Sequence, residues 1–137
     1  MLREVADDLA ATVALIVAEG AEAVAIAVVE PPSVDFHLTF KRASRHPPER
    51  GSAGYALLSA GPPADGEPDA VRQARERGYA ISKGEVEPNA HGVAVPVISP
   101  SLPLRACLNL ITYRDDVAAA APERMLLAAA QLADKLA

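Results

Sequence analysis

Two neighbouring segments, residues 91–98 and 104–113, place the strongest constraint on what this chain can fold into. In the second segment two sets of side chains alternate: Leu104, Ala106, Leu108, Leu110 and Thr112 with Arg105, Cys107, Asn109, Ile111 and Tyr113. A period of two is that of a β-strand, whose successive side chains point to opposite faces of a sheet. The connection between the segments is short and contains proline. This predicts a hairpin, and therefore an antiparallel pair of strands.

Further strands are predicted earlier in the chain. Residues 23–29 are small and apolar, become β-branched toward their end and stop at a pair of prolines. That pattern is typical of a strand buried on both faces. Residues 36–41 alternate between large apolar and polar side chains, which predicts a half-buried strand paired with the first. A strand also begins at residues 79–82, and a turn-rich connection follows over residues 83–90.

Helical patterns flank these strands. Residues 2–18 predict one amphipathic helix that stops at Gly20, because apolar residues recur at helical spacing at Leu2, Val5, Leu9, Val13 and Ile16. Residues 51–60 predict a turn that enters a short helix, and residues 69–77 a charged helix ending at Gly78. A closing helix is predicted to have Pro122 in its first turn and one apolar face made of Leu126, Ala129, Leu132, Ala133 and Leu136.

The order of these elements predicts the fold class. Residues 45–50 and 61–68 are rich in proline or glycine and predict loops. A chain of 137 residues fits a single domain, residues 1–137, around one core. Helices at both ends of a twisted, mainly antiparallel sheet of about five to six strands form an α+β arrangement.

Composition narrows the classes of partner. The net charge is −5, which argues against a nucleic-acid grip, since phosphate binding draws on clustered Lys and Arg. The local basic cluster of Lys41, Arg42, Arg45 and Arg50 is interpreted as a solvated loop. The single cysteine, Cys107, excludes an internal disulfide and lies in an apolar run, where a free thiol behaves as a small buried hydrophobe.

The sequence contains no secretory signal and no apolar run long enough to span a membrane, because Glu19 and Glu22 interrupt the longest stretch. A cytoplasmic location without membrane contact is therefore expected.

None of the common catalytic motifs is present. His37, His46 and His91 are isolated, and the sequence has no metal-ligand spacing, nucleophile elbow or phosphate loop. Cys107 with His91 on a neighbouring strand is the one candidate nucleophile pair, and Glu85 with Glu87 the one candidate carboxylate pair. We interpret the two glutamates as solvated loop acids. No cofactor, metal or catalytic residue is predicted, and the chain is not expected to be an enzyme.

Residues 75–97, together with residues 51–58 (GSAGYALL), resemble the C-terminal effector-binding domain of the IclR family of transcription regulators. The family pattern there is a small-residue turn entering a short helix, then R-x-x-G-Y-A, an acidic turn, and A-x-P-V. The residues that match without a gap are Arg75, Gly78, Tyr79, Ala80, Glu85, Ala94, Pro96 and Val97.

The resemblance implies a GAF-like (profilin-like) domain in which loops and a short helix cover one face of the sheet and form an effector pocket. The family's effectors are mostly small organic acids. Carried over to this sequence, the effector-binding residues are Ser52, Ala53, Ser82, Gly92, Asn109 and Ile111. The start of the short helix at Ser52 offers backbone N–H donors that suit a carboxylate.

The sequence departs from the family pattern at several of these positions. Tyr55 stands where the family often has Lys, and Asn89 displaces the glycine of the acidic turn. Acidic or hydroxyl residues are common where this chain has Ser82 and Ile111. Gly92 and Ile111 offer few side-chain hydrogen bonds. The expected effector is therefore larger and partly apolar, for example an aromatic or medium-chain acid.

The resemblance also implies a homo-oligomer, a dimer or a tetramer, whose rearrangement on effector binding controls DNA binding. DNA would be contacted only through an N-terminal winged helix-turn-helix domain that is absent from these 137 residues. This leaves open an excised domain or a protein without a DNA reader. The alternatives to a sensor are a GAF-like enzyme, such as a redox-active thiol protein, and a stand-alone interaction module without ligand.

Overall fold

The computed structural model describes residues 2–20, 22–31, 45–46, 51–85, 88–99, 101 and 105–136. The elements in chain order are α1 (Leu2–Leu9), β1 (Thr12–Glu19), β2 (Glu22–Val29), β3 (Arg45–His46), α2 (Gly51–Ser59), α3 (Asp69–Arg77), β4 (Ala80–Lys83), β5 (His91–Val97), β6 (Ala106–Thr112) and α4 (Asp115–Leu136). The strands form one antiparallel sheet in the order β3-β2-β1-β6-β5-β4. This confirms the predicted α+β class with a mainly antiparallel sheet.

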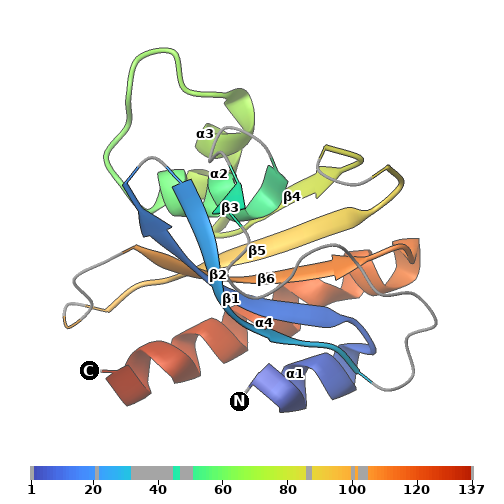
Figure 1. Cartoon of the computed structure of the whole chain (residues 1–137). Coiled ribbons are helices and arrows are strands. Elements are labelled where there is room, and N and C mark those ends of the chain that lie inside the picture. Colours follow the sequence, from blue (N-terminus) through green and yellow to red (C-terminus); the bar gives the residue numbers. More distant parts are fainter. Residues whose placement is uncertain are drawn as a thin grey trace.

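Helices cover both faces of the sheet (Figure 1). Helices α1 and α4 pack on the face that we call the α4 face, and α2 and α3 pack on the opposite, α2 face. The α4 face of β1, β5 and β6 carries Val13, Val93, Val95, Val97, Leu108 and Leu110. The α2 face of the same strands carries Thr12, Ala14, Ile16, Gly92, Ala94, Cys107, Asn109 and Ile111. The two faces thus differ in side-chain size and polarity.

Several local predictions are confirmed. Strands β5 and β6 pair as the predicted hairpin, with Val93 opposite Leu110. The short helix α2 and the charged helix α3 form where their patterns place them. Gly78 ends α3 in the left-handed conformation, with φ of 91°, and its N–H donates to the Ala74 carbonyl at 2.8 Å. A glycine adopts this conformation without the steric penalty that a Cβ brings.

The prediction of one helix over residues 2–18 is wrong. Helix α1 ends at Leu9, Ala10 has a φ of 50°, and the chain continues as strand β1. The β-branched run of β1 suits a central strand that pairs on both sides, with β2 and with β6. Val13 and Ile16, assigned to one helix face by their spacing, lie on opposite faces of the sheet.

The closing helix begins earlier than predicted. Helix α4 starts at Asp115, so Pro122 lies inside it rather than in its first turn. Acidic residues in that first turn stabilise the helix N-terminus. The face that packs on the sheet is made of Ala121, Met125, Ala128 and Ala129, while Leu126 is 39% exposed. The predicted face is therefore right for Ala129, Leu132 and Ala133, which pack against this core, and wrong for Leu126.

Two expectations for the region around β2 are corrected. Ile26 is 44% exposed, so β2 is not buried on both faces. The register of β1 with β2 shifts at this point, which is the signature of a β-bulge that turns a side chain out of the sheet. Arg45 and His46, predicted as loop, form the short strand β3 against β2. The predicted strand over residues 36–41 and the rest of the basic cluster lie outside the described residues.

Candidate functional site

The N-terminal turn of α2 sits directly on the sheet through a small polar cluster. The Ser52 N–H donates to Oγ of Ser82 on β4 at 3.1 Å. The Ser52 hydroxyl donates to Oδ1 of Asn109 on β6 at 2.7 Å. Ser52 and Asn109 are both buried, so these bonds replace the hydrogen bonds to water that their polar groups have lost. Ser52, Ser82 and Asn109, which the resemblance assigned to one site, are therefore in direct contact.

Gly92 lies on β5 beneath this cluster and permits the close approach of α2. A Cβ at this position would lie 2.2 Å from Ser52 Oγ and 2.8 Å from Ser82 Oγ. Those separations are too short for any side chain, so the serines occupy the space that glycine leaves. Gly92 thus brings α2 down onto the sheet.

The strand register places the remaining predicted residues on the same surface. Gly92 pairs with Ser82 on one side and with Ile111 on the other, so the three share a row across the sheet. Ala53 is buried in α2, and its carbonyl oxygen accepts from the Cys107 thiol at 3.7 Å. Asn109 and Ile111 lie on one face of β6, as the period-two pattern predicts. All six predicted residues therefore lie on the α2 face or in the helix over it.

One residue of this surface was not predicted from the sequence. Thr12 is opposite Ile111 on β1, in the same row as Gly92 and Ser82, and is 1% exposed. Its Oγ1 has no hydrogen-bond partner among the residues that the structure describes. The helix predicted over residues 2–18 hid this position, because it placed Thr12 on a polar helix face. Recognition of the β-branched run after Ala11 as a strand was the available signal.

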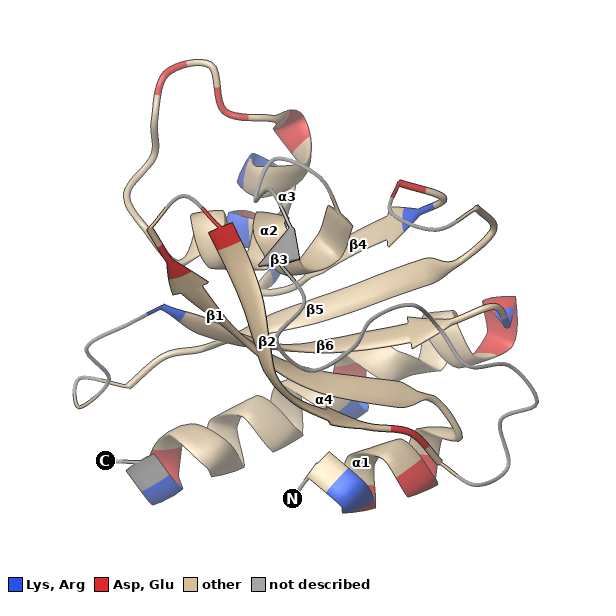
Figure 2. Cartoon of the chain, in the orientation of Figure 1, with Lys and Arg blue, Asp and Glu red and all other residues tan. Residues whose placement is uncertain are grey.

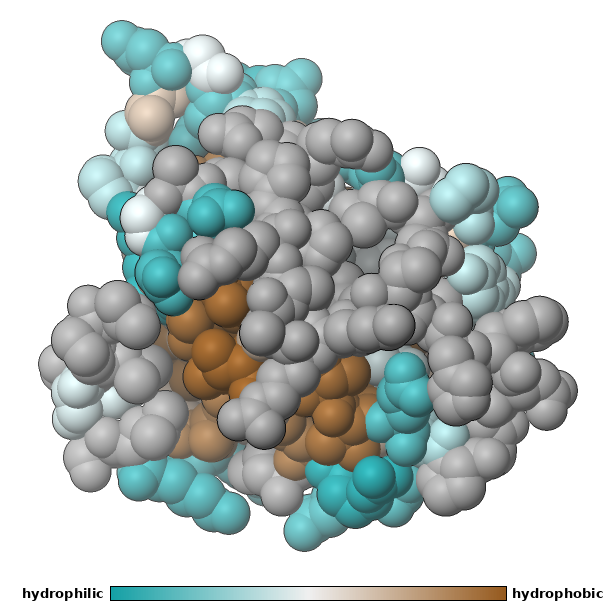
Figure 3. Space-filling view, viewed as in Figure 1, coloured by the Kyte–Doolittle hydropathy of each residue, from teal (hydrophilic) through white to brown (hydrophobic). Residues whose placement is uncertain are grey.

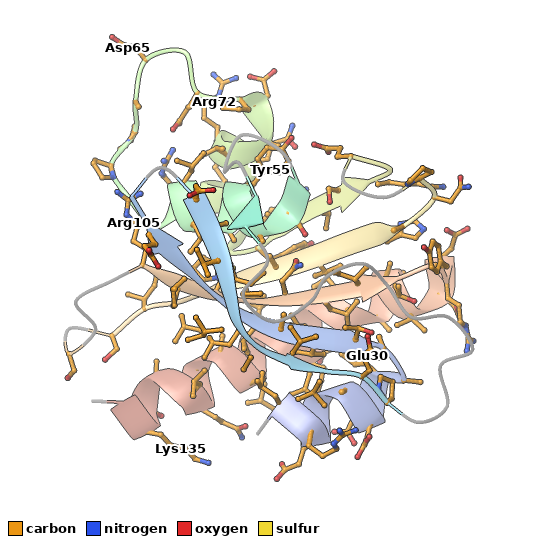
Figure 4. All side chains as sticks on the ribbon, viewed as in Figure 1. Glu30, Tyr55, Asp65, Arg72, Arg105 and Lys135 are labelled. Atoms are coloured by element: carbon orange, nitrogen blue, oxygen red, sulfur yellow. The ribbon has the colours of Figure 1, made fainter. Side chains whose placement is uncertain are left out.

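Glu85 is a structural acid rather than the solvated loop acid expected. Its Oε1 accepts hydrogen bonds from the Gly51 N–H at 3.4 Å and from the hydroxyl of Tyr55, which Figure 4 labels on α2. A carboxylate at a helix N-terminus satisfies an otherwise unpaired donor and faces the positive end of the helix dipole. The expected pairing of Glu85 with Glu87 falls partly outside the described residues.

In the ribbon coloured by charge, few Lys, Arg, Asp or Glu positions fall within the strands of the sheet (Figure 2). The sheet is uncharged along most of its length, and the charges gather at strand ends, on helix surfaces and in loops. Apolar side chains are visible over β1 and β2 in the space-filling view (Figure 3). The described floor of the α2 face therefore offers hydrogen-bonding groups and apolar surface without a side-chain cation.

The proposed nucleophile pair of Cys107 and His91 does not form. Cys107 is opposite Pro96, whereas His91 is opposite Thr112 at the other end of the same ladder. His91 instead contacts Asp115 at the start of α4. Complete burial raises the pKa of the Cys107 thiol far above its ordinary range, which keeps it protonated and unreactive.

The described residues hold no group of three His, Cys, Asp or Glu side chains that could bind a metal ion. None of the described helices combines the length and the apolar character that crossing a membrane requires.

This fold is shared by solved structures of transcription regulators, several of which are IclR-family members. An IclR regulator from Alicyclobacillus acidocaldarius superposes with a TM-score of 0.83 at 20% identity, over 99% of this chain and 65% of that one. An IclR-family regulator from Rhodococcus gives a TM-score of 0.83 at 24% identity, over 98% and 60%. The C-terminal domain of a transcriptional regulator from Vibrio cholerae gives 0.77 at 18% identity, over 99% and 91%.

The resemblance seen around residues 75–97 is thus confirmed at the level of the fold. The chain spans only 60 to 65% of the length of the longer regulators. No protein-family model and no curated protein matches the sequence.

Proposed function

We propose that this chain is the ligand-sensing domain of an IclR-type transcription regulator and binds a small, partly apolar organic acid on its α2 face. The observation that supports it best is the polar cluster of Ser52, Ser82 and Asn109 under the N-terminus of α2, in which Ser52 and Asn109 are buried. Polar groups converging on an otherwise apolar surface are the usual make-up of a small-molecule site. The fold supports the proposal, since its solved relatives are regulators.

The start of α2 supplies the donors for the acid. The first four N–H groups of a helix have no acceptor within the helix. Glu85 and Ser82 provide acceptors for the first two, those of Gly51 and Ser52. We propose that a ligand carboxylate serves the following N–H groups, of Ala53 and Gly54, where the helix dipole favours negative charge.

The side chains around the cluster argue for a ligand with an apolar part. Ala14 and Ala94 have small apolar side chains on this face of the sheet, and Ile111 contributes further apolar surface. A very small hydrophilic acid would gain little from such a floor, since apolar contact area is what an aromatic ring or alkyl chain adds. Aromatic and medium-chain acids are therefore the expected class.

The regulatory step would be a change in subunit arrangement. A ligand that binds one arrangement of a dimer or tetramer more tightly shifts the population toward it. DNA contact would come from a separate domain, in keeping with the net charge of −5 of this chain.

Calorimetric titration tests the proposal. Benzoate and hexanoate should bind the wild type, and glyoxylate and pyruvate should bind at least tenfold more weakly. Asn109→Leu should weaken benzoate binding because it removes the buried amide of Asn109 while keeping the branched shape of the side chain. Gln73→Leu removes an amide from the exposed surface of α3 and should leave binding unchanged. Tight binding of glyoxylate or pyruvate alone, or of none of the four acids, would contradict the proposed ligand class.

A further inference from the structure

Thr12 is a buried hydroxyl that the described fold leaves without a hydrogen bond. It is 1% exposed at the start of β1, a central strand of the sheet. Its Oγ1 is unpartnered among the described residues, whereas the Ser52 and Asn109 side chains bond each other. An unsatisfied buried hydroxyl is rare and destabilising, because it has given up its hydrogen bonds to water. Its presence therefore calls for a partner that these residues do not supply.

The register aims Thr12 at the candidate site. Thr12 is opposite Ile111, and Ala14, two residues along β1 and on the same face, is opposite Asn109. Thr12 and Asn109 thus stand at diagonal corners of a square whose other corners are Ala14 and Ile111. Diagonal Cβ atoms in such a square lie about 7 Å apart, a span that the two oxygens of a carboxylate bridge. Ala14 carries only a methyl group at the corner between them.

The two polar corners offer matching chemistry. The described hydrogen bonds use Oδ1 of Asn109 and leave its NH2 group, which carries two donors. The Thr12 hydroxyl supplies one donor and can rotate to suit its partner. Both corners can therefore donate to oxygen atoms that lie between them.

We propose that Thr12 is a specificity-determining contact: its hydroxyl donates to one oxygen of the ligand carboxylate while the Asn109 amide donates to the other. This inference rests on the proposed function and adds a residue on β1 to the site. A ligand lacking a hydrogen-bond acceptor at this point would leave the Thr12 hydroxyl unpaired and would bind more weakly.

Thr12→Val tests the proposal, because valine keeps the shape and removes the hydroxyl. Without ligand the variant should melt about 3 °C above the wild type, since an unsatisfied hydroxyl has been removed. Its affinity for benzoate in calorimetry should fall about tenfold, the factor that one ordinary hydrogen bond contributes. Thr12→Ser keeps the hydroxyl and should keep the affinity within about twofold.

Thr112→Val is the matched control on the opposite face. Thr112 is also buried, but its Oγ1 accepts a hydrogen bond from the Arg114 N–H at 3.1 Å. This variant should melt below the wild type and bind benzoate unchanged.

Each other result has a distinct meaning. A Thr12→Val protein that binds benzoate like the wild type, or that melts below it, overturns the role of Thr12 and leaves the proposed function standing. A wild type that binds none of the acids benzoate, hexanoate, pyruvate and glyoxylate overturns both proposals.

Discussion

The two faces of the sheet are formed by the same strands but carry side chains of different size and polarity. Toward α4, β5 and β6 present Val93, Val95, Val97, Leu108 and Leu110. Toward α2, they present Gly92, Ala94, Pro96, Cys107, Asn109 and Ile111. The first set is large and entirely apolar, and the second is small or polar with one exception, Ile111. The contrast indicates that the α4 face supplies most of the stability, whereas the α2 face retains polar groups that stabilise the fold little.

Burial energies support this division. Each Val or Leu buried on the α4 face contributes about 1.5–3 kcal/mol. A buried hydroxyl or amide contributes little even when bonded, and destabilises the fold when it is not. Replacing Thr12, whose Oγ1 has no partner among the described residues, by an apolar residue of similar size should raise stability, and the bonded pair of Ser52 and Asn109 contributes little for its burial. Their presence on one face is what the proposed ligand site explains.

The largest expected effect lies on the α4 face. Leu108 is fully buried in β6, so Leu108→Ala removes apolar contacts and leaves a cavity. The free energy of unfolding should fall by about 3–4 kcal/mol, measured by urea denaturation. The benzoate affinity of the folded fraction should be unchanged. A loss below about 1 kcal/mol would contradict the view that the α4 face supplies most of the stability.

A smaller effect on stability and a larger one on binding are expected at Gly92. A Cβ here would meet Ser52 Oγ at 2.2 Å, so Gly92→Ala should push α2 away from β5. Overpacking of this kind costs about 1–3 kcal/mol, and benzoate binding should be lost with the cluster. Thermal unfolding and calorimetry on the same samples measure both.

Gly61→Ala is the control for Gly92. A Cβ at Gly61 would meet Arg105 Nη1 at 2.7 Å, but that atom ends a flexible, exposed side chain, labelled in Figure 4, that can move aside. This variant should unfold and bind like the wild type. If Gly61→Ala and Gly92→Ala lost stability and benzoate affinity to the same extent, the close packing of α2 on Gly92 would not explain the effect of the Gly92 variant.

The smallest effect concerns Cys107 and appears only at high pH. Burial raises the pKa of this thiol, so the unfolded chain ionises first as pH rises. The free energy of unfolding is therefore unaffected below the ordinary thiol pKa and decreases as the pH rises above it. Between pH 7 and about 9.5 the wild type should lose about 1 kcal/mol more than Cys107→Ala in urea denaturation. An equal pH dependence, or rapid labelling of the folded thiol at pH 7, would contradict its burial.

Local patterns predicted the elements whose signals are local. The alternation in β6, the glycine that ends α3 and the small residues that open α2 each determine their element directly. Strand β1 was missed because Val13 and Ile16 fit helical spacing as well as strand spacing, and only pairing with β2 and β6 decides between them.

The candidate site divides in the same way. Ser52, Ser82, Gly92 and Asn109 were assigned together through the family resemblance, and their contacts in the structure agree with that grouping. Thr12 could not be assigned, because its place depends on the register of β1 with β6. The capping role of Glu85 also depends on a tertiary contact, across the turn that follows β4.

A benzoate titration followed by two-dimensional NMR of methyl and amide groups tests most directly whether the ligand binds on the α2 face. We expect shifts that concentrate there, at Thr12, Ala14, Asn109 and Ile111, with little change at Val93 or Leu110 on the opposite face. A groove of about 300 Å³ lies beside α4 and includes Ile98 and Leu126 among its lining residues. Shifts that concentrate in that groove, or that spread over the α4 face, would contradict ligand binding on the α2 face.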